Sequence, residues 1–500
     1  MFSFFRVGRE APTKKQRRLL TLLKDWHLVL LERVEMLSER ASLALQPSLP
    51  YFGLFLRSLS NLHSADNPSG VVSFCVAENA LSAPLVSAKL REVSALPPPP
   101  GQLGYDNMRG RSCLLSAFSA LAARLITGGA PVDPGQLCIS SGCGALLQHL
   151  AFLLLDKGDC LLLATPTYPA LYNDVRVLAG VQIEDVPVPP GQALTPAALD
   201  AACARATARG LRPRMLLLLH PENPLGTVRG STELLDIVAW VDAQGPAFHL
   251  VSDEIYALSV YDPEGGAAFT SMASVRHAAA VAATAAAAAA AAGSSATATA
   301  AAAAPLYLGS NTHILWGFSK DFCASGLRCG VLFTHSPALL SALDNVAYFA
   351  AVANPTQDAL AAAIGDPAWV DAYLAANHAA LREAREAVCS ALSRAGVPHT
   401  RPWAGLYVWL DLSAWLAPVA PEGSSSGGGS GGSGSAFSGE RRLTEALLAA
   451  GVLMTPGEAC HAPKPGCFRL CFAWHSSMES VRVGCERLVK FLAENAGGVF

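Results

Sequence analysis

The sequence predicts an α/β fold built around a mostly parallel β-sheet, with one large domain and a smaller one. From residue 71 onward, short apolar runs typical of strands alternate with helical segments, and this alternation predicts βαβ units. Polar residues follow several of these runs directly, and ligands gather at the carboxyl ends of strands in such sheets. The predicted strands are 137–140, 160–164, 215–220, 248–251 and 313–316, and the helices lie near 145–155 and 231–243.

The composition is that of a chain with a sizeable core. Of its 500 residues, 51% are hydrophobic and 15% are charged, which suits one large domain with a smaller companion. The formal net charge is -3, so no global basic field indicates a nucleic-acid partner. Outside an alanine-rich tract, no apolar run is uniform enough for a membrane span, and we expect no membrane partner.

The thirteen cysteines are scattered, without a Cys-x-x-Cys pair. The nearest cluster is Cys460-His461 with Cys467 and Cys471, which a metal site could use. We expect instead reduced, mostly buried cysteines of an intracellular protein, and no metal.

The first 66 residues differ from the rest and predict an extension that is partly disordered or helical. Lys14, Lys15, Arg17 and Arg18 precede a helical pattern over about 19–45. A basic start is compatible with organelle targeting, but acidic residues nearby weaken that interpretation. We expect a cytoplasmic protein, with targeting as the alternative.

Two low-complexity segments interrupt the remaining chain. One is the alanine-rich insertion 278–304, and the other is the Gly/Ser-rich loop 423–439; neither can hold a packed core. The expected organisation places the N-terminal part of the small domain at 67–103, the large domain at 104–340 and the C-terminal part of the small domain at 341–500.

The first candidate functional residue is Lys320, at the end of the apolar run 313–316 in Trp-Gly-Phe-Ser-Lys-Asp. Arg328 follows eight residues later. A lysine just after the carboxyl end of a strand can form a Schiff base with a bound carbonyl compound. Arg328 and Ser319 can bind a phosphate, because arginine offers a permanently charged, bidentate fork. This arrangement is typical of enzymes that use pyridoxal 5'-phosphate (PLP).

Other strand ends supply the rest of such a pocket. Gly142 and Cys143 lie where a strand ends and a helix opens, so backbone amides can approach a phosphate there. Tyr168, after the next strand, can stack on a pyridine ring. Each feature alone also fits an ordinary connection or loop residue.

Two further strand ends carry groups that suit the pyridine ring itself. Asp253, in Val-Ser-Asp-Glu-Ile-Tyr, can keep the ring nitrogen protonated, which makes the ring an electron sink. Asn223 and Tyr256 can donate hydrogen bonds to the ring's phenolate oxygen. The structural alternative for Asp253 is a helix cap.

Near the C-terminus, Arg469 lies in the apolar run Phe-Arg-Leu-Cys-Phe. A buried charge is costly without a partner. The α-carboxylate of a small-molecule amino acid substrate would satisfy it, as would an internal salt bridge.

In this order and spacing, the motifs resemble those of the class I/II aminotransferases, the fold-type I PLP enzymes, over roughly residues 67–500 apart from the two insertions. The resemblance is closest to 1-aminocyclopropane-1-carboxylate (ACC) synthases and to animal-type ACC-synthase-like proteins. It implies a large PLP-binding domain with a mostly parallel, seven-stranded sheet and a smaller α+β domain. The stretches that carry it are 67–70, 77–81, 223–227, 325–328, 404–411, 456–457 and 465–469.

The resemblance also implies roles that spacing does not reveal. Tyr105 matches the tyrosine that reaches the neighbouring subunit's active site, which implies a homodimer with shared sites. Glu78 matches a glutamate close to the substrate's amino-acid end. The chain departs from the family pattern at five positions, namely Ala80, Cys143, Gly317, Cys323 and Ser325, and these departures bear on the substrate more than on the cofactor.

Two reactions fit these residues. In both, Arg469 holds the α-carboxylate and Lys320 removes the α-proton. ACC synthase chemistry then closes a ring on S-adenosylmethionine, whereas a transaminase passes the amino group to a 2-oxo acid. A PLP-fold regulator that binds DNA is a remote alternative, as is an inert scaffold, but 1–66 does not resemble a helix-turn-helix with a wing.

Overall fold

The computed structural model describes residues 38, 41–45, 49, 51–292, 306–417, 436–497 and 500. Most of the helical pattern expected over 19–45 lies outside these residues, apart from the short helix α2 (Ala41–Leu45). The second half of the alanine-rich insertion and most of the Gly/Ser-rich loop also lie outside them.

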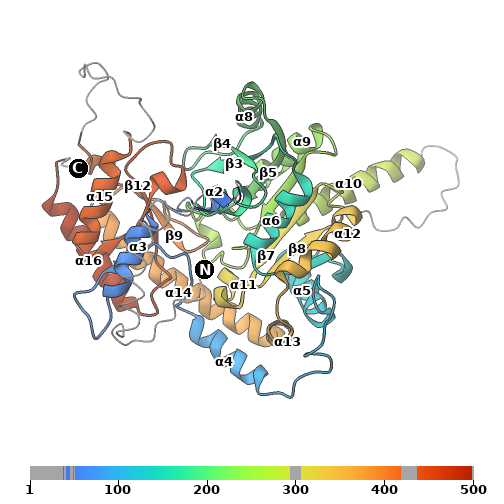
Figure 1. Cartoon of the computed structure of the whole chain (residues 1–500), viewed down its shortest axis with the longest axis horizontal. Helices are drawn as coiled ribbons and strands as arrows, with labels where there is room; N and C mark the ends of the chain where they lie inside the picture. The colour runs from blue at the N-terminus through green and yellow to red at the C-terminus, as the bar shows by residue number, and fades with distance from the viewer. Residues whose placement is uncertain are drawn as a thin grey trace.

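A seven-stranded sheet forms the centre of the large domain (Figure 1). Six strands run in one direction, and β8 is antiparallel to both of its neighbours. The sequence prediction of an α/β fold with a mostly parallel sheet is confirmed. In spatial order the strands are β2 (Leu137–Ser140), β8 (Gly330–Thr334), β7 (Thr312–Gly317), β6 (His249–Asp253), β5 (Arg212–Leu219), β3 (Asp159–Thr165) and β4 (Gln182–Pro187).

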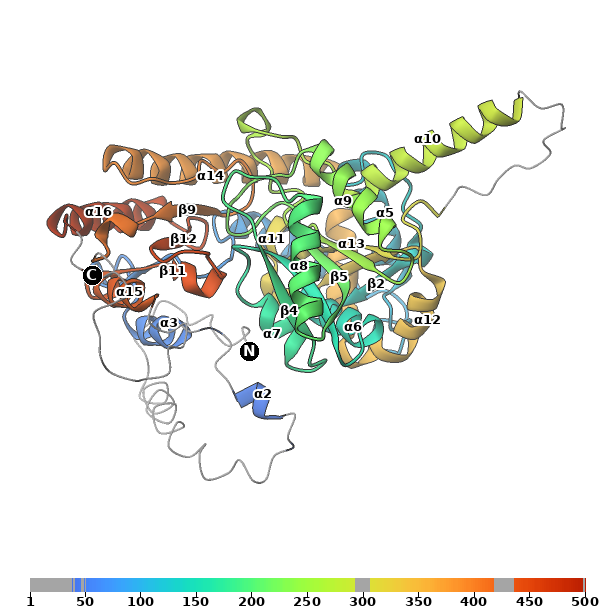
Figure 2. The same ribbon diagram turned by 90° about the horizontal axis from the view of Figure 1, so that it is seen from above.

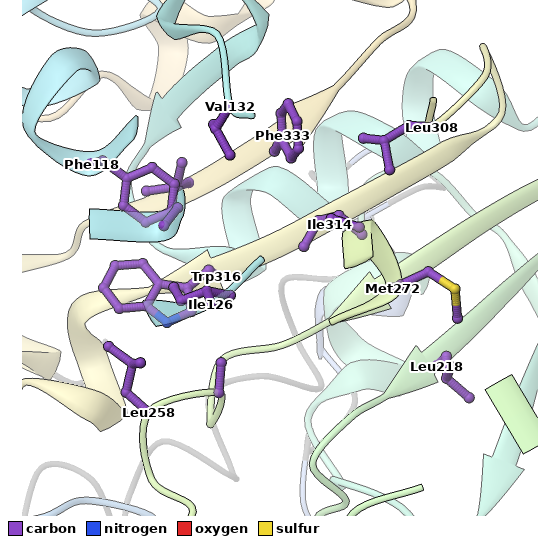
Figure 3. Close-up of a cluster of buried hydrophobic side chains, with 14 of the residues drawn as sticks. Phe118, Ile126, Val132, Leu218, Leu258, Met272, Leu308, Ile314, Trp316 and Phe333 are labelled. Atoms are coloured by element: carbon purple, nitrogen blue, oxygen red, sulfur yellow. The ribbon is translucent and has the colours of Figure 1, made fainter. Parts of the chain in front are cut away.

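The central strands are apolar on both faces because helices cover both sides of the sheet. Alternate residues of one strand point to opposite faces, so Leu216 and Leu218 of β5 join one core cluster, whereas Met215 and Leu217 join the other. Figure 3 shows the first cluster, in which Trp316 of β7 lies near Phe118 and Ile126.

The first cluster includes residues of α5 (Ser112–Leu125), α8 (Pro196–Ala208), α9 (Ser231–Ala243) and α13 (Asn354–Ile364). The second includes α6 (Cys143–Leu154), α7 (Leu171–Arg176) and α12 (Pro337–Val346). The first cluster extends from Val86 of α4 (Ala83–Ser94) to Leu374 of α14 (Pro367–Arg394). The core of the large domain therefore includes residues before and after 104–340, the range expected for this domain from the sequence.

The smaller domain packs its own helices against short strands. Its antiparallel sheet joins β11 (Thr455–Pro456), β12 (Cys467–Cys471) and β9 (Tyr407–Asp411), and β1 (Val72–Ser73) pairs with β10 (Val452–Leu453). Helices α14, α15 (Ser438–Ala449) and α16 (Met478–Glu494) complete it, and α14 continues alongside the large domain (Figure 2).

The helix α3 (Phe52–Ser58) precedes the expected domain start but packs on the small domain. Its Phe55 shares a core cluster with Leu49, Tyr51 and Leu453. Residues 49–58 thus have a packed position against the structure that follows them.

The alanine-rich insertion begins as a continuation of α10 (Met272–Ala292). Met272 and Ala273 are buried, whereas the helix beyond them projects from the large domain (Figure 2). Alanine has the highest helix propensity, which accounts for a helix that continues as its residues become exposed. None of the described helices is both long enough and apolar enough to cross a membrane.

The close approach of α16 to β1 generates a stability prediction. A Cβ on Gly484 would lie 2.5 Å from Phe74 Cζ and 2.7 Å from Val72 Cγ1. We expect Gly484→Ala to lower the free energy of unfolding by about 1–3 kcal/mol, because overpacking outweighs the helix propensity of alanine. The matched control is Gly53→Ala in α3, where nothing lies within 4 Å, and it should be neutral or stabilising. Thermal unfolding of both variants checks this, and equal midpoints would contradict it.

Candidate active site

The polar residues that follow the strands meet at one edge of the large sheet. They surround a cavity of about 270 Å³ that lies between the two domains. Its lining includes seven of the residues expected from sequence, namely Glu78, Cys143, Tyr168, Ser319, Lys320, Arg328 and Arg469. Parallel strands end at a common edge, and this explains how residues far apart in the chain converge.

Lys320 lies in the short helix α11 (Phe318–Asp321), directly after β7. Its Nζ donates a hydrogen bond to the Ala77 carbonyl oxygen of the small domain. Burial lowers the pKa of Lys320 because it disfavours the ammonium form, and the Glu78 carboxylate opposes this effect. A lysine with a lowered pKa is suited to act as a nucleophile and as a base.

The proposed phosphate end is built by Gly142 and Arg328. The Arg328 guanidinium donates to the Ser141 carbonyl at 3.3 Å and to the Ser325 carbonyl at 3.0 Å. Gly142 has a φ of +86°, and a Cβ there would lie 2.4 Å from Arg328 Nη2. Glycine is therefore required both for the backbone conformation and for the approach of the guanidinium.

Two departures from the family pattern are neighbours in space. Cys143, the first residue of α6, donates its Sγ–H to the Trp316 carbonyl at 3.3 Å. A Cβ on Gly317 would lie 3.0 Å from this sulfur. The sulfur of Cys143 thus uses space that a larger residue at 317 would need.

At the proposed ring side, Asp253 ends β6 and is 8% exposed. Burial raises the pKa of Asp253 to about 6, whereas the Ile255 N–H and the Lys320 ammonium oppose the rise. Nearby, the Tyr256 and Tyr407 hydroxyls are hydrogen-bonded, and the Asn223 amide donates to the Tyr407 hydroxyl at 3.3 Å. Asn223 and Tyr256 thus direct their polar ends to one place.

Arg469 of β12 is 1% exposed, and its hydrogen-bond partners among the described residues are all neutral. Its guanidinium donates to Asn223 Oδ1 at 3.1 Å, to the Cys75 carbonyl at 2.9 Å and to Thr455 Oγ1 at 3.1 Å. Its Nε has no partner among the described residues. A buried cation with neutral partners, at the wall of a cavity, is suited to bind an anion.

Tyr105 is the one sequence-predicted site residue that the structure does not bring near this cavity. Its side chain is 99% exposed on a segment that also exposes Leu103. In contrast, Asn223, Asp253 and Tyr256 are buried close to the residues that line the cavity.

The cysteine–histidine cluster near the C-terminus does not form a metal site. No group of three or more His, Cys, Asp or Glu side chains in the described part of the chain could hold a metal ion. His461 instead bonds Asp185, and all thirteen cysteines are free.

Sequence reasoning missed several residues of this site. Leu49, Tyr51, Phe52 and Phe55 form an apolar wall of the cavity, although residues 1–66 were expected to be an extension. Asp174 also lines the cavity, and burial raises the pKa of this carboxyl to about 7, aided by Asp253 and opposed by Arg328. The helical spacing of Phe52 and Phe55 was the available signal for the wall.

Asp321, next to Lys320, is a further missed residue. Its carboxylate accepts from the Leu258 N–H at 2.9 Å, the Ser259 hydroxyl at 2.6 Å and the Trp316 indole at 2.9 Å. These contacts join the turn of Lys320 to the loop that carries Tyr256. Asp321 is thus a positioning residue beneath the cavity.

This fold and site define a class I/II aminotransferase of the PLP-dependent enzymes. The family described as Aminotransferase class I and II matches residues 101–488, and the chain belongs to that family. It is a PLP-dependent enzyme.

Among known proteins, the chain is 35% identical to 1-aminocyclopropane-1-carboxylate synthase 4 of Oryza sativa subsp. japonica, over 86% of this chain and 84% of that protein. It is 28% identical to the 1-aminocyclopropane-1-carboxylate synthase-like protein 1 of Mus musculus, over 85% and 77%. Another mouse relative, also 28% identical, covers 87% of the chain and 68% of its own length, and its name is "Probable inactive 1-aminocyclopropane-1-carboxylate synthase-like protein 2".

Solved structures share the fold. Thermus thermophilus aspartate aminotransferase with maleate has a TM-score of 0.67 and 23% identity, and it covers 91% of this chain and 99% of its own. The Rhizobium meliloti enzyme has a TM-score of 0.70 and 18% identity, and it covers 92% and 99%. At these identities the likeness extends to the fold alone.

The Gly142–Arg328 contact generates a prediction about the cofactor. We expect Gly142→Ala to raise the PLP dissociation constant on the order of tenfold or more, because the new Cβ displaces the Arg328 guanidinium. A tenfold change corresponds to a loss of only about 1.4 kcal/mol of binding free energy. Gly158→Ala is the matched control, since Gly158 has a similar φ of +91° with nothing within 4 Å. PLP titration followed by absorbance measures both constants. Equal affinities of the two variants would contradict the assignment.

The buried Asp253 generates a prediction about pH. Its pKa rises from 3.8 to about 6 on folding. The protonated carboxyl therefore contributes its full share to the free energy of unfolding below pH 3.8, and this contribution is lost as the pH rises through 6. We expect wild-type apoprotein to lose up to about 3 kcal/mol relative to Asp253→Asn between pH 4 and pH 7.

Urea unfolding of both apoproteins across this range measures the difference. Comparison with the variant is needed because burial also raises the pKa of Glu254 and of Asp321 to about 7. Parallel pH profiles for the two proteins would show that Asp253 does not titrate in this way.

Proposed function

We propose that the residues around the cavity hold PLP in the manner that the sequence predicted. The absence of a side chain at Gly142 leaves room for the Arg328 guanidinium, and Ser319 and Arg328 both line the cavity. Lys320 would hold the cofactor covalently, Asp253 would face its ring nitrogen, and Asn223 and Tyr256 would bind its phenolate oxygen, with Tyr168 against the ring. When bound, PLP supplies an electron sink for the α-carbon of an amino acid.

We propose further that the substrate is S-adenosylmethionine and that the reaction is of the ACC synthase type. The observation that carries this proposal is the Glu78 carboxylate, which lines the cavity and acts electrostatically on Lys320. A carboxylate beside the reacting lysine favours a substrate with a positive charge near its reacting carbons, as in a sulfonium. The similarity to the rice protein, 35% identical, supports the same choice.

In this reaction Arg469 binds and orients the α-carboxylate, and its neutral partners keep the guanidinium charge available. Lys320 takes the α-proton. A bond then forms between the α- and γ-carbons while the γ-carbon–sulfur bond breaks, and its electron pair leaves with the sulfur of methylthioadenosine. The apolar wall at Leu49, Tyr51 and Phe55 excludes water and offers a surface for the nucleoside.

Transamination is the second candidate, since Lys320, Asp253 and Arg469 would serve it equally. A transaminase does not require a cationic substrate, so a role for the Glu78 carboxylate in substrate binding would favour the synthase reaction over transamination. The known relatives include proteins named as synthases and one named as probably inactive. The assay below therefore tests whether this protein catalyses either reaction.

We propose that the chain forms a homodimer with shared active sites and that Tyr105 contributes to the partner's site. Tyr105, Leu103 and Phe349 are largely exposed on the single chain. Phe349 neighbours Ala350, whose carbonyl accepts from the Ser141 N–H at 2.8 Å, beside the phosphate loop. An exposed apolar surface next to the site supports such an interface. The cytoplasmic location stays a prediction.

The function test combines absorbance with product analysis. We expect purified protein with PLP to show the visible absorbance of a lysine-bound cofactor, Lys320→Ala to lose it, and Lys464→Ala, an exposed lysine paired with Asp411, to keep it. With S-adenosylmethionine, the wild type should release ACC and methylthioadenosine in equal amounts.

Glu78→Gln should lower kcat/KM for S-adenosylmethionine by at least about tenfold, which corresponds to about 1.4 kcal/mol of lost transition-state stabilisation. Glu92→Gln, at an exposed carboxylate outside the cavity, should have no effect. Turnover only with an amino acid and a 2-oxo acid would replace the synthase proposal with the transaminase, and turnover in neither assay would reject both.

A further inference from the structure

A second cavity, of about 400 Å³, lies on the outer edge of the large domain and belongs to no function described so far. It is formed along the edge strand β4 by residues of α7 and α8 and by His461 of the small domain. It shares no lining residue with the active-site cavity. We call it the β4 pocket.

Two arginines of the β4 pocket are held in place by one buried carboxylate. Glu184 of β4 is 5% exposed, and it accepts from Arg205 Nε at 2.8 Å and from Arg209 Nη1 at 2.6 Å. Arg205 also donates to the Asp185 carbonyl at 2.7 Å. A guanidinium has five N–H groups, so each arginine keeps donors in reserve, and the two side chains remain 49% and 54% exposed.

The third cation of the β4 pocket is Arg176, the last residue of α7. It is exposed, and its side chain has no hydrogen bond or ion pair with another residue in the part of the chain that the structure describes. Glu184 already neutralises the charge of its arginine partners in part, whereas Arg176 contributes a charge without compensation. The pocket therefore has a surplus of positive charge over its two carboxylates.

The remaining wall consists of two stacked rings. Tyr172 and His461 lie with ring centroids 3.6 Å apart and planes at 7°. Asp185 accepts from the Tyr172 hydroxyl and from His461 Nδ1, the latter at 2.9 Å. Both oxygens of Asp185 are thus engaged, and the Nε2 edge of His461 remains for a ligand. The wall is rigid, since the Thr167 N–H also bonds the Cys460 carbonyl at 2.8 Å.

We propose that the β4 pocket binds a small phosphate-bearing molecule. Arginine forks match the geometry of phosphate oxygens, and charge-assisted bonds of this kind are the stronger ones. Glu184 holds two of the forks before a ligand arrives, so less conformational entropy is lost on binding. A concave pocket of this volume suits a small molecule.

The experiment uses full-length, PLP-loaded protein and inorganic pyrophosphate as the probe, at low salt, in isothermal titration calorimetry. We expect one saturable site per chain and an affinity that falls at least fivefold in Arg176→Gln. This variant removes no side-chain hydrogen bond or ion pair among the described residues, so it should fold as the wild type does. Arg209→Gln should weaken binding similarly, although it also leaves Glu184 with one partner fewer.

The matched control is Arg212→Gln, which removes the same charge from an exposed arginine outside the pocket, where Arg212 pairs with Asp159. It should leave the affinity unchanged. Equal weakening in Arg176→Gln and Arg212→Gln would indicate unspecific attraction and overturn the proposal. Absence of saturable binding, or binding that displaces PLP and its visible absorbance, would overturn it as well.

Discussion

The arrangement of the active site depends on one buried carboxylate that does not line the cavity. Asp321 is fully buried directly after Lys320. Its oxygens accept from the backbone of Leu258, the hydroxyl of Ser259 and the indole of Trp316. A buried carboxyl is tolerated only when such donors satisfy it. Because the donors come from the loop after β6 and from β7 itself, this one group sets the position of Lys320 relative to Tyr256 and Asp253.

The charges around the cavity form the second constraint. Arg328, Lys320 and Arg469 line the cavity, and Asp253 is buried close to them. The nearby cations add to the lowering of the Lys320 pKa that burial causes. A ligand that carries both a phosphate and a carboxylate would neutralise the exposed Arg328 and the buried Arg469, and its carboxylate would offset the cost of burying the Arg469 charge. Glu78 is the cavity carboxylate that acts on Lys320, and this is why the proposed function assigns substrate choice to it.

Most of the large sheet was predictable because its strands are short apolar runs with polar residues at their ends. The run 137–140 is β2 itself, and the run 160–164 is β3 without its end residues. The site residues that directly follow these runs, such as Tyr168 and Lys320, were predictable for the same local reason. Tyr407 was not singled out, because its partner Tyr256 lies 151 residues earlier in the chain. The wall of Leu49 and Tyr51 was missed because the packed segment is short and its contacts are with residues far along the chain, such as Leu453.

The sequence by itself determined the family and the cofactor, and it predicted Lys320 as the reacting lysine, because motif order and hydrophobic periodicity can be read from the chain locally. Only the tertiary structure decided that β8 runs against its neighbours, that the partners of Arg469 are neutral, and that the departures at Cys143 and Gly317 adjoin each other. It alone brought Arg176, Arg205 and His461 to one pocket. The physical reason is that burial, pairing of charges and close contact depend on which distant segments pack together, and no local pattern records that.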